Sequence, residues 1–288
     1  MQLIWPWQDR QRRFSALKAG VFALMFVPGI RLIEEYATGQ YGFYPMAVGG
    51  LIFWTGVWAT AILLLALAIT PAQKIFRWGA LIDVRRMVGV AALIYTVIHL
   101  VFYFPLRLWN LSFIADEMLK RPTLVAATLS TILMIALGVT SVDAAVRRMG
   151  ARNWQLLHNT VYLASVLAFL HILARGTAPE QFLLAGMFFW LMAWRVLDRY
   201  GYGTDAKILA ALAVVSCLAT AGIEAGCTLS HRGYPLWETL GNNFNLDLGV
   251  SAAWQILVIG LIIAVAAAAR NGIRLSWGQA TYPARQGG

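Results

Sequence analysis

The chain has 288 residues, of which 60% are hydrophobic and only 12% are charged, and its mean hydropathy is +0.66. Soluble domains are nearer half apolar and a quarter charged, so this composition excludes a water-soluble protein and predicts an integral membrane protein. The net charge of +10 does not indicate nucleic-acid binding, because basic residues in membrane proteins gather in cytoplasmic loops. Membrane lipid is the expected surrounding, and no nucleic-acid partner is expected.

Eight segments are apolar and long enough to cross a bilayer as helices, which takes about 20 residues. They are residues 14–33, 47–70, 86–106, 123–142, 153–174, 180–197, 206–224 and 249–269. The connections between them are too short to hold a soluble domain. We therefore predict an all-α fold, a polytopic membrane helix bundle.

Lysine and arginine are distributed unequally between the two sides of these segments. With the N-terminus inside, seventeen lie in inner segments and six lie in outer ones. The outer six are Arg31, Arg107, Lys120, Arg121, Arg175 and Arg232. Because basic residues are retained on the cytoplasmic side, both termini are predicted to be cytoplasmic, as an even number of spans requires.

The remaining sequence offers no sign of a substrate site. Cys217 and Cys227 form neither a metal motif nor a disulfide framework. On one helix, ten residues apart, they would lie about 15 Å apart and could not form a bridge. No nucleophile is paired with a base, and no G-x-G-x-x-G nucleotide fingerprint follows a strand. Any electron donor is therefore expected to be a separate molecule.

Three of the four histidines lie in two predicted spans: His99 in 86–106, and His158 and His171 in 153–174. At 1.5 Å per residue, His99 lies about 21 Å and His171 about 28 Å beyond the basic residues that precede their spans. These two therefore share the outer half of the membrane. His158, only about 9 Å along, lies near the inner surface.

Two imidazoles on facing apolar helices suit the axial ligation of a haem, whose flat apolar ring is readily buried between helices. Zinc would need three or four ligands, and no cysteine or carboxylate lies nearby. A proton relay favours acidic residues within the bilayer, whereas Asp143 and Asp198 lie at span ends. A hydrogen bond between helices also remains open for each histidine. His158 and His171 are thirteen residues apart, so either their helix is bent or they face different neighbours.

The segments that carry these histidines resemble the MsrQ (YedZ) family. The similarity lies in four blocks, which in order are LLALAITPAQ, RRMVGVAALIYTVIHL, LKRPTLVAATLSTILMIALGVTS and NWQLLHNTVYLASVLAFLHIL. Members are haem-binding membrane subunits of a methionine sulfoxide reductase system, within the ferric-reductase-like transmembrane superfamily. The resemblance covers about residues 14–200 and implies a six-helix haem-binding core.

The resemblance also implies cofactors, partners and a location. It implies one or two haem b groups and allows FMN near the inner surface. Electrons would come from a cytoplasmic flavin reductase or the quinol pool. They would leave to a periplasmic, molybdopterin-containing, MsrP-like methionine sulfoxide reductase. The chain would be an electron-transfer subunit, without a catalytic site of its own, in the bacterial inner membrane.

The family pattern assigns roles to particular histidines. By resemblance, His99 and His171 are the axial pair of one haem, and His158 is the family's third histidine. Larger ferric reductases have four histidines, two on each helix. Here the fourth position, level with His158, falls near Arg85 and Arg86. This leaves a second bis-histidine haem open.

Other residues near the inner surface are candidates for cofactor binding. Arg85 and Arg86 could hold a haem propionate or a flavin phosphate, for which the planar guanidinium is suited, or could simply mark the inner side. Trp154 and Gln155 could contact flavin or propionate. An interfacial position alone would also explain the tryptophan.

The sequence departs from the family pattern after residue 200. Residues 1–200 are predicted to form the haem-binding domain, and residues 201–288 a C-terminal membrane extension of two helices with an outer loop that contains His231. The loop is either a partner-docking segment or a solvated connector. Two other functions remain open: a membrane reductase that acts directly on ferric iron or a quinone, and a non-redox helical scaffold.

Overall fold

The computed structural model describes residues 5–9, 11–42 and 46–280, and the side chains of these residues up to residue 270. In this part of the chain the regular structure is helical, and the strand-like pairing is one isolated bridge between Gln8 and Phe14. Seven helical segments of the described residues are long and apolar enough to cross a membrane. The prediction of an all-α, multi-pass membrane bundle is therefore confirmed.

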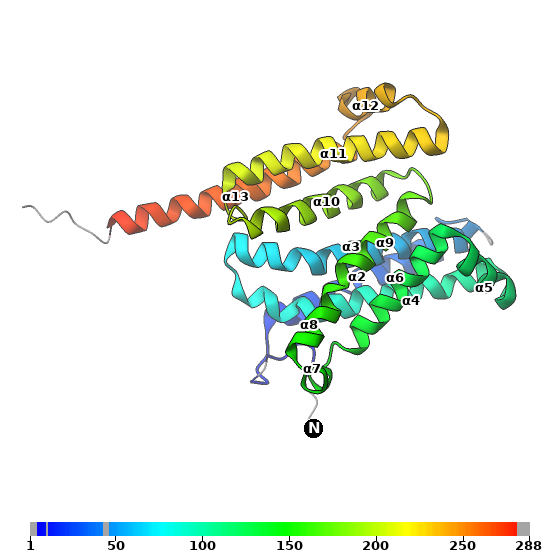
Figure 1. Ribbon diagram of the computed structural model, residues 1–288, viewed down its shortest axis with the longest axis horizontal. Coiled ribbons are helices and arrows are strands. Elements are labelled where there is room, and N and C mark those ends of the chain that lie inside the picture. The colour runs from blue at the N-terminus through cyan, green and yellow to red at the C-terminus, as the bar shows by residue number, and fades with distance from the viewer. Residues whose placement is uncertain (1–4, 10, 43–45, 281–288) are drawn as a thin grey trace, which may run out of the picture. The chain divides into compact units, whose positions relative to one another are not determined.

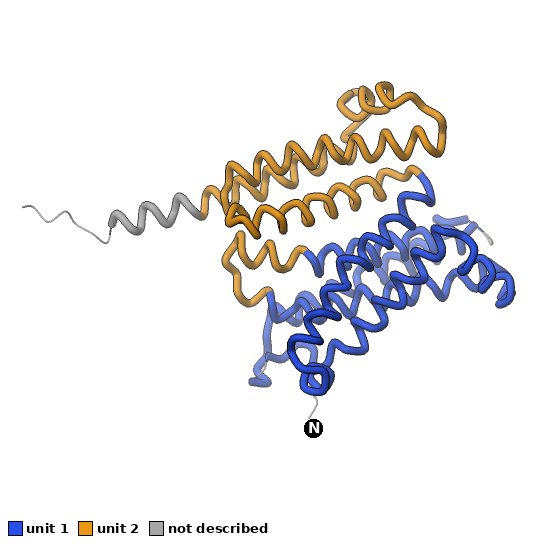
Figure 2. The backbone as a smooth tube through the Cα atoms, in the orientation of Figure 1, with its two compact units in different colours: residues 1–67, 82–176 blue, residues 68–81, 177–288 orange. Residues whose placement is uncertain are grey.

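The chain divides into two compact units, which Figure 2 shows in different colours. Unit 1 comprises residues 1–67 and 82–176, and unit 2 comprises residues 68–81 and 177–288. These units describe packing, so the predicted functional division after residue 200 stays a prediction.

Unit 1 combines long apolar helices with shorter ones (Figure 1). In chain order they are α1 (Ala16–Leu24), α2 (Val27–Ala37), α3 (Met46–Phe76, shared with unit 2), α4 (Arg85–Leu106), α5 (Leu111–Lys120), α6 (Pro122–Val139), α7 (Asp143–Met149), α8 (Ala151–Asn159) and α9 (Val161–Leu173). A 3-10 helix, η1 (Gly79–Val84), precedes α4.

The predicted span 14–33 is two helices, because a tyrosine interrupts its hydrogen-bond ladder. Pro28 lacks an N–H, and the next N–H, of Gly29, donates to the Tyr95 hydroxyl at 2.8 Å. That hydroxyl donates in turn to the carbonyl of Met25 at 2.9 Å. An uninterrupted helix would join Gly29 to Met25 directly, so Tyr95 of α4 is inserted between α1 and α2 and attaches them to α4.

Unit 2 contains α10 (Pro179–Arg199), α11 (Ala206–Arg232), α12 (Leu236–Phe244), η2 (Leu246–Leu248) and α13 (Ala252–Ala280). Helices α10, α11 and α13 lie side by side (Figure 1). Small residues permit this close packing: a Cβ on Gly186 would lie 2.2 Å from Thr220 Oγ1, and one on Gly260 would lie 2.5 Å from the Cβ of Ala213. Close approach at small residues is how helices commonly associate in lipid.

The helix boundaries bear on two expectations about the C-terminal part. The predicted span 180–197 forms α10, but α10 is less apolar than the seven segments that meet the length and composition of a span. The predicted outer loop is largely helical, because α11 continues to Arg232 and α12 follows. Cys217 and Cys227 both lie on α11 as free thiols, as their spacing predicts.

Candidate functional site

His99 of α4 and His171 of α9 face each other in unit 1. Their ring centroids are 6.4 Å apart, and the ring planes are inclined at 73°. His99 Nδ1 lies 2.8 Å from the carbonyl oxygen of Ile52, and His171 Nδ1 lies 3.0 Å from that of Thr123. A carbonyl can only accept a hydrogen bond, so each Nδ1 is the protonated nitrogen. Each Nε2 therefore keeps its lone pair for a metal.

The separation of the two rings fits one metal between them. A metal–imidazole bond is about 2.0–2.1 Å long, and two such bonds in line would place the ring centroids roughly 6.3 Å apart. The described residues contain no group of three or more His, Cys, Asp or Glu that could hold a metal ion. The pair therefore suits a metal whose remaining ligands come from a macrocycle, as in haem, and not a zinc ion.

Helix α3 makes room for the His99 ring. A Cβ on Gly56 would lie 3.0 Å from Cε1 and 3.1 Å from Nδ1 of that ring. Thr55, which is fully buried, places its Oγ1 3.3 Å from the same Nδ1. The sequence did not predict either residue, because both lie on α3, which carries no histidine. A threonine beside a glycine within an apolar span could have indicated a polar contact and a close approach at this position.

A break at Thr160 accounts for the spacing of His158 and His171. The two histidines lie on different helices, α8 and α9, which meet at this residue. The Thr160 N–H donates to the carbonyl of Leu157 at 3.0 Å, a tighter turn than that of an α-helix, and its hydroxyl donates to the same carbonyl at 2.7 Å. The regular rotation per residue is therefore interrupted between the histidines. Both contact α6, His171 at its first turn and His158 just beyond its end.

His158 is held by its neighbours on α8 and at the end of α6. Its ring stacks on Trp154 with centroids 3.8 Å apart and planes inclined at 23°. Its Nε2 lies 3.2 Å from the hydroxyl of Thr140, and Trp154 Nε1 donates to the carbonyl of that threonine at 2.9 Å. Trp154 and His158 thus form one aromatic pair fixed to Thr140, a residue that the sequence had not singled out.

The arginines predicted to lie near His158 do so, and Gln155 points elsewhere. Arg85 and Arg86 are close enough to interact electrostatically with the His158 ring. Arg86 also pairs with Asp143 at 2.7 Å. Gln155 is exposed and donates to the Asn159 side chain at 2.8 Å. Its role in cofactor binding stays a prediction.

A cavity of about 1550 Å³ lies in unit 1 between the N-terminal helices and α4. On α4 its wall extends from Arg86 to Pro105 and includes Tyr95. The wall is mainly apolar, and its charged residues belong to segments at the Arg85 end of α4. These are Asp9, Lys18, Asp83, Arg86 and Asp143. Sequence reasoning did not predict this amphipathic cavity.

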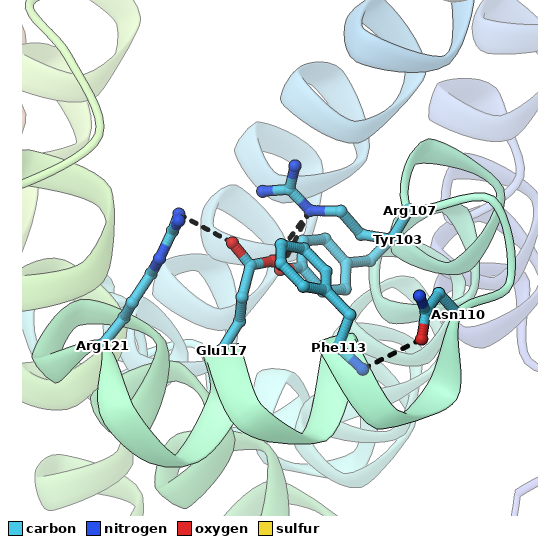
Figure 3. Close-up of polar contacts among 6 residues, drawn as sticks. All are labelled: Tyr103, Arg107, Asn110, Phe113, Glu117 and Arg121. Atoms are coloured by element: carbon cyan, nitrogen blue, oxygen red, sulfur yellow. Dashed lines mark hydrogen bonds and ion pairs between the residues drawn. The ribbon is translucent and has the colours of Figure 1, made fainter.

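A buried carboxylate lies near the other end of α4, beyond the histidine pair (Figure 3). The Glu117 side chain is only 4% exposed. Its Oε2 pairs with Arg107 Nε at 2.8 Å and its Oε1 with Arg121 Nη1 at 2.8 Å. The Tyr103 hydroxyl donates to the same carboxylate. A hydrogen bond to Tyr103 contributes most to raising the pKa of Arg107 above its usual value, so this guanidinium stays charged.

Known proteins resemble this chain over the region that contains the site. The model of a family described as ferric reductase like transmembrane component matches residues 55–169, which include His99 and His158 and end just before His171. The protein-methionine-sulfoxide reductase heme-binding subunit MsrQ of Azospira oryzae is 32% identical over 196 residues, which cover 67% of this chain and 83% of the relative. The chain belongs to the MsrQ family.

Another MsrQ shows the same extent of similarity. The protein of that name from Cronobacter sakazakii is 34% identical over 188 residues, which cover 64% of this chain and 92% of the relative. No solved structure significantly matches the chain. The family relationship thus rests on sequence, and the site geometry rests on the residues described above.

The close approach of Gly56 to His99 gives a first prediction. Gly56→Ala should destabilise the protein by about 1–3 kcal/mol, because its new methyl group overlaps the imidazole. Gly49→Ala is the matched control, since it lies on the same helix and its Cβ would meet nothing within 4 Å. Thermal unfolding of both variants in one detergent checks this. Equal stability of the two variants would contradict the described packing.

Proposed function

We propose that this MsrQ-family chain is a b-type cytochrome subunit that carries electrons across the membrane to a methionine sulfoxide reductase. The observation that carries the proposal is the His99–His171 pair, with rings 6.4 Å apart and each Nδ1 hydrogen-bonded to a carbonyl. The relatives' names, which describe heme-binding subunits of protein-methionine-sulfoxide reductase, support it.

A haem held by this pair would supply one-electron transfer at its iron. The chain's own residues prepare the ligands. The carbonyls of Ile52 and Thr123 hold each ring in one tautomer and orientation, and such hydrogen bonds raise the basicity of the coordinating nitrogen. Thr55 and Gly56 fix the His99 ring from a third helix. The apolar residues that flank the two histidines on α4 and α9 lower the local dielectric.

We propose that electrons enter at the Arg85 end, which faces the cytoplasm. The distribution of seventeen inner and six outer basic residues supports this orientation and cytoplasmic termini in a bacterial inner membrane. His158, stacked on Trp154, would serve a second cofactor there, either another haem b or FMN. Arg85 and Arg86 are suited to its propionate or phosphate groups, since guanidinium binds such anions through paired hydrogen bonds.

The cavity supports the quinol pool as the electron donor over a soluble cytoplasmic flavin reductase. Its volume of about 1550 Å³ exceeds the roughly 300–1,000 Å³ of sites for drug-sized ligands. A long apolar wall with charges at one end suits a molecule with an isoprenoid tail and a polar head. Tyr95, which is one of the lining residues, precedes His99 by one helical turn.

We propose that electrons leave at the Arg107 end to a periplasmic, molybdopterin-containing, MsrP-like reductase. The relatives' place in a methionine sulfoxide reductase supports this partner. A second candidate is direct reduction of ferric iron or a quinone at that end, which the ferric-reductase-like family model favours. Reduction of ferric chelates by the isolated, quinol-supplied protein would favour the second candidate.

Ligand substitution tests the haem assignment. His99→Ala and His171→Ala should each abolish the low-spin haem between α4 and α9. His158→Ala should retain the absorption bands of that haem. His231→Ala is the matched control, because His231 is exposed and its one bond among the described residues is to the Cys227 carbonyl of its own helix. Reduced-minus-oxidised spectra and haem quantified per chain give the result. Unchanged spectra in both His99→Ala and His171→Ala would show that the axial pair is misassigned.

Blocking the cavity tests the donor. Val90→Trp should slow reduction by a quinol at least tenfold, because the indole would fill part of the cavity, while dithionite still reduces the protein. Ile132→Trp is the control, since Ile132 is 56% exposed on α6 and lies outside the cavity. Stopped-flow absorbance measures both rates. Equal rates for the two variants would favour the cytoplasmic flavin reductase as donor.

A further inference from the structure

The Arg107 end of the histidine site is more basic than membrane topology explains. Three of the six predicted outer basic residues lie at this end of the helices that build the site: Arg107 follows α4, Arg121 precedes α6 and Arg175 follows α9. Arg107 and Arg121 share Glu117, and Arg175 is close enough to interact electrostatically with both histidine rings. Basic residues are retained mainly on the cytoplasmic side, so a cluster at the opposite end needs a specific reason.

Three links of chain connect this cluster to the histidines. Tyr103, whose hydroxyl donates to Glu117, lies one turn beyond His99 on α4, about 6 Å along the helix axis. Arg107, at the end of the same helix, lies about 12 Å beyond His99. Arg121 is two residues before Thr123, whose carbonyl accepts from His171. Arg175 follows the end of α9, on which His171 lies. The cluster therefore lies at the same end of the pair on every helix that builds it.

Glu117 fixes the two arginines without using all their hydrogen-bond donors. Arg107 engages the carboxylate through Nε, and Figure 3 shows its terminal nitrogens directed away from Glu117. Those nitrogens have no acceptor among the described residues. A guanidinium has five N–H donors in a rigid plane, so donors remain for an additional anion. Stacking over Tyr103 and Phe113, at 5.3 and 5.7 Å, holds the Arg107 head in place.

The charges of the cluster match the carboxylates of a haem. Three arginines and one glutamate sum to +2. A haem carries two propionate carboxylates on one edge, which sum to −2 when ionised. Arginine–carboxylate pairs are among the strongest charge-assisted hydrogen bonds in proteins, and they are stronger still where water is excluded.

We propose that Arg107 and Arg121, which Glu117 holds in place, and Arg175 bind the propionates of the haem ligated by His99 and His171. This inference rests on the proposed function. It orients the haem edge towards the Arg107 end, where electrons leave, and it gives the arginines a redox role. Reduction adds an electron to the site, so adjacent positive charge favours the reduced state and raises the midpoint potential.

The test uses the full chain purified with its haem. Arg107→Gln, Arg121→Gln and Arg175→Gln should each lower the midpoint potential in a spectroscopic redox titration and speed haem release to a haem-scavenging protein. Lys120→Gln is the matched control: it removes the same charge beside Arg121, but Lys120 is 74% exposed and pairs with Asp116 on its own helix. The low-spin spectrum should persist in all four variants, because the histidines are untouched.

Arg175→Gln keeps the inference testable if the other variants fold poorly, since it leaves both Glu117 ion pairs intact. Arginine variants whose potential and haem release equal those of Lys120→Gln would overturn the inference. Loss of bound phospholipid from the arginine variants, with an unchanged potential, would assign the cluster to a lipid phosphate and also overturn it. Failure of the proposed function looks different, because the unsubstituted protein would then contain no haem.

Discussion

The structure of unit 1 depends on two hydrogen bonds from imidazole to backbone carbonyl. They join His99 to Ile52 and His171 to Thr123, and so tie α4 to α3 and α9 to α6. Buried polar groups in an apolar environment need partners, and these bonds supply one for each ring. Because each bond consumes the Nδ1 proton, it also leaves the opposite nitrogen free for a metal. The same two hydrogen bonds therefore hold neighbouring helices together and orient the two histidines as a ligand pair.

The polar contacts of unit 1 follow the same logic at three levels along the helices. At one end, Trp154 and His158 are fixed to Thr140. In the middle, the buried hydroxyl of Ser130 on α6 donates to the carbonyl of Ala164 on α9 at 2.8 Å. At the other end, Glu117 gathers two arginines. Charged groups lie at the ends and neutral ones between, which suits a bundle that conducts electrons through an apolar layer.

Hydropathy and residue counting were sufficient to predict most of the helical segments and the shared level of His99 and His171, but not the division of the first span into α1 and α2. They could not predict the break at Thr160, because it arises from local hydrogen bonds to Leu157 that leave the apolar pattern unchanged. The hydrogen-bond partners of the histidine rings could not be predicted either. They are backbone carbonyls, which every residue has. The cavity depends on the spacing of α1 and α2 from α4 in the folded protein, so the sequence pattern of each helix could not predict it. In the sequence Glu117 is one acidic residue in a polar connection. Its pairing with Arg107 and Arg121 is visible only in the folded structure.

The most direct test of this account is the visible spectrum of the detergent-purified protein before and after dithionite, with haem quantified per chain. We expect sharp reduced bands of a low-spin, bis-histidine haem b at one or two haems per chain. A stoichiometry of two would place the second haem at His158. A colourless protein from haem-replete cells would contradict the account, and the facing histidines would then serve only to bind helices together.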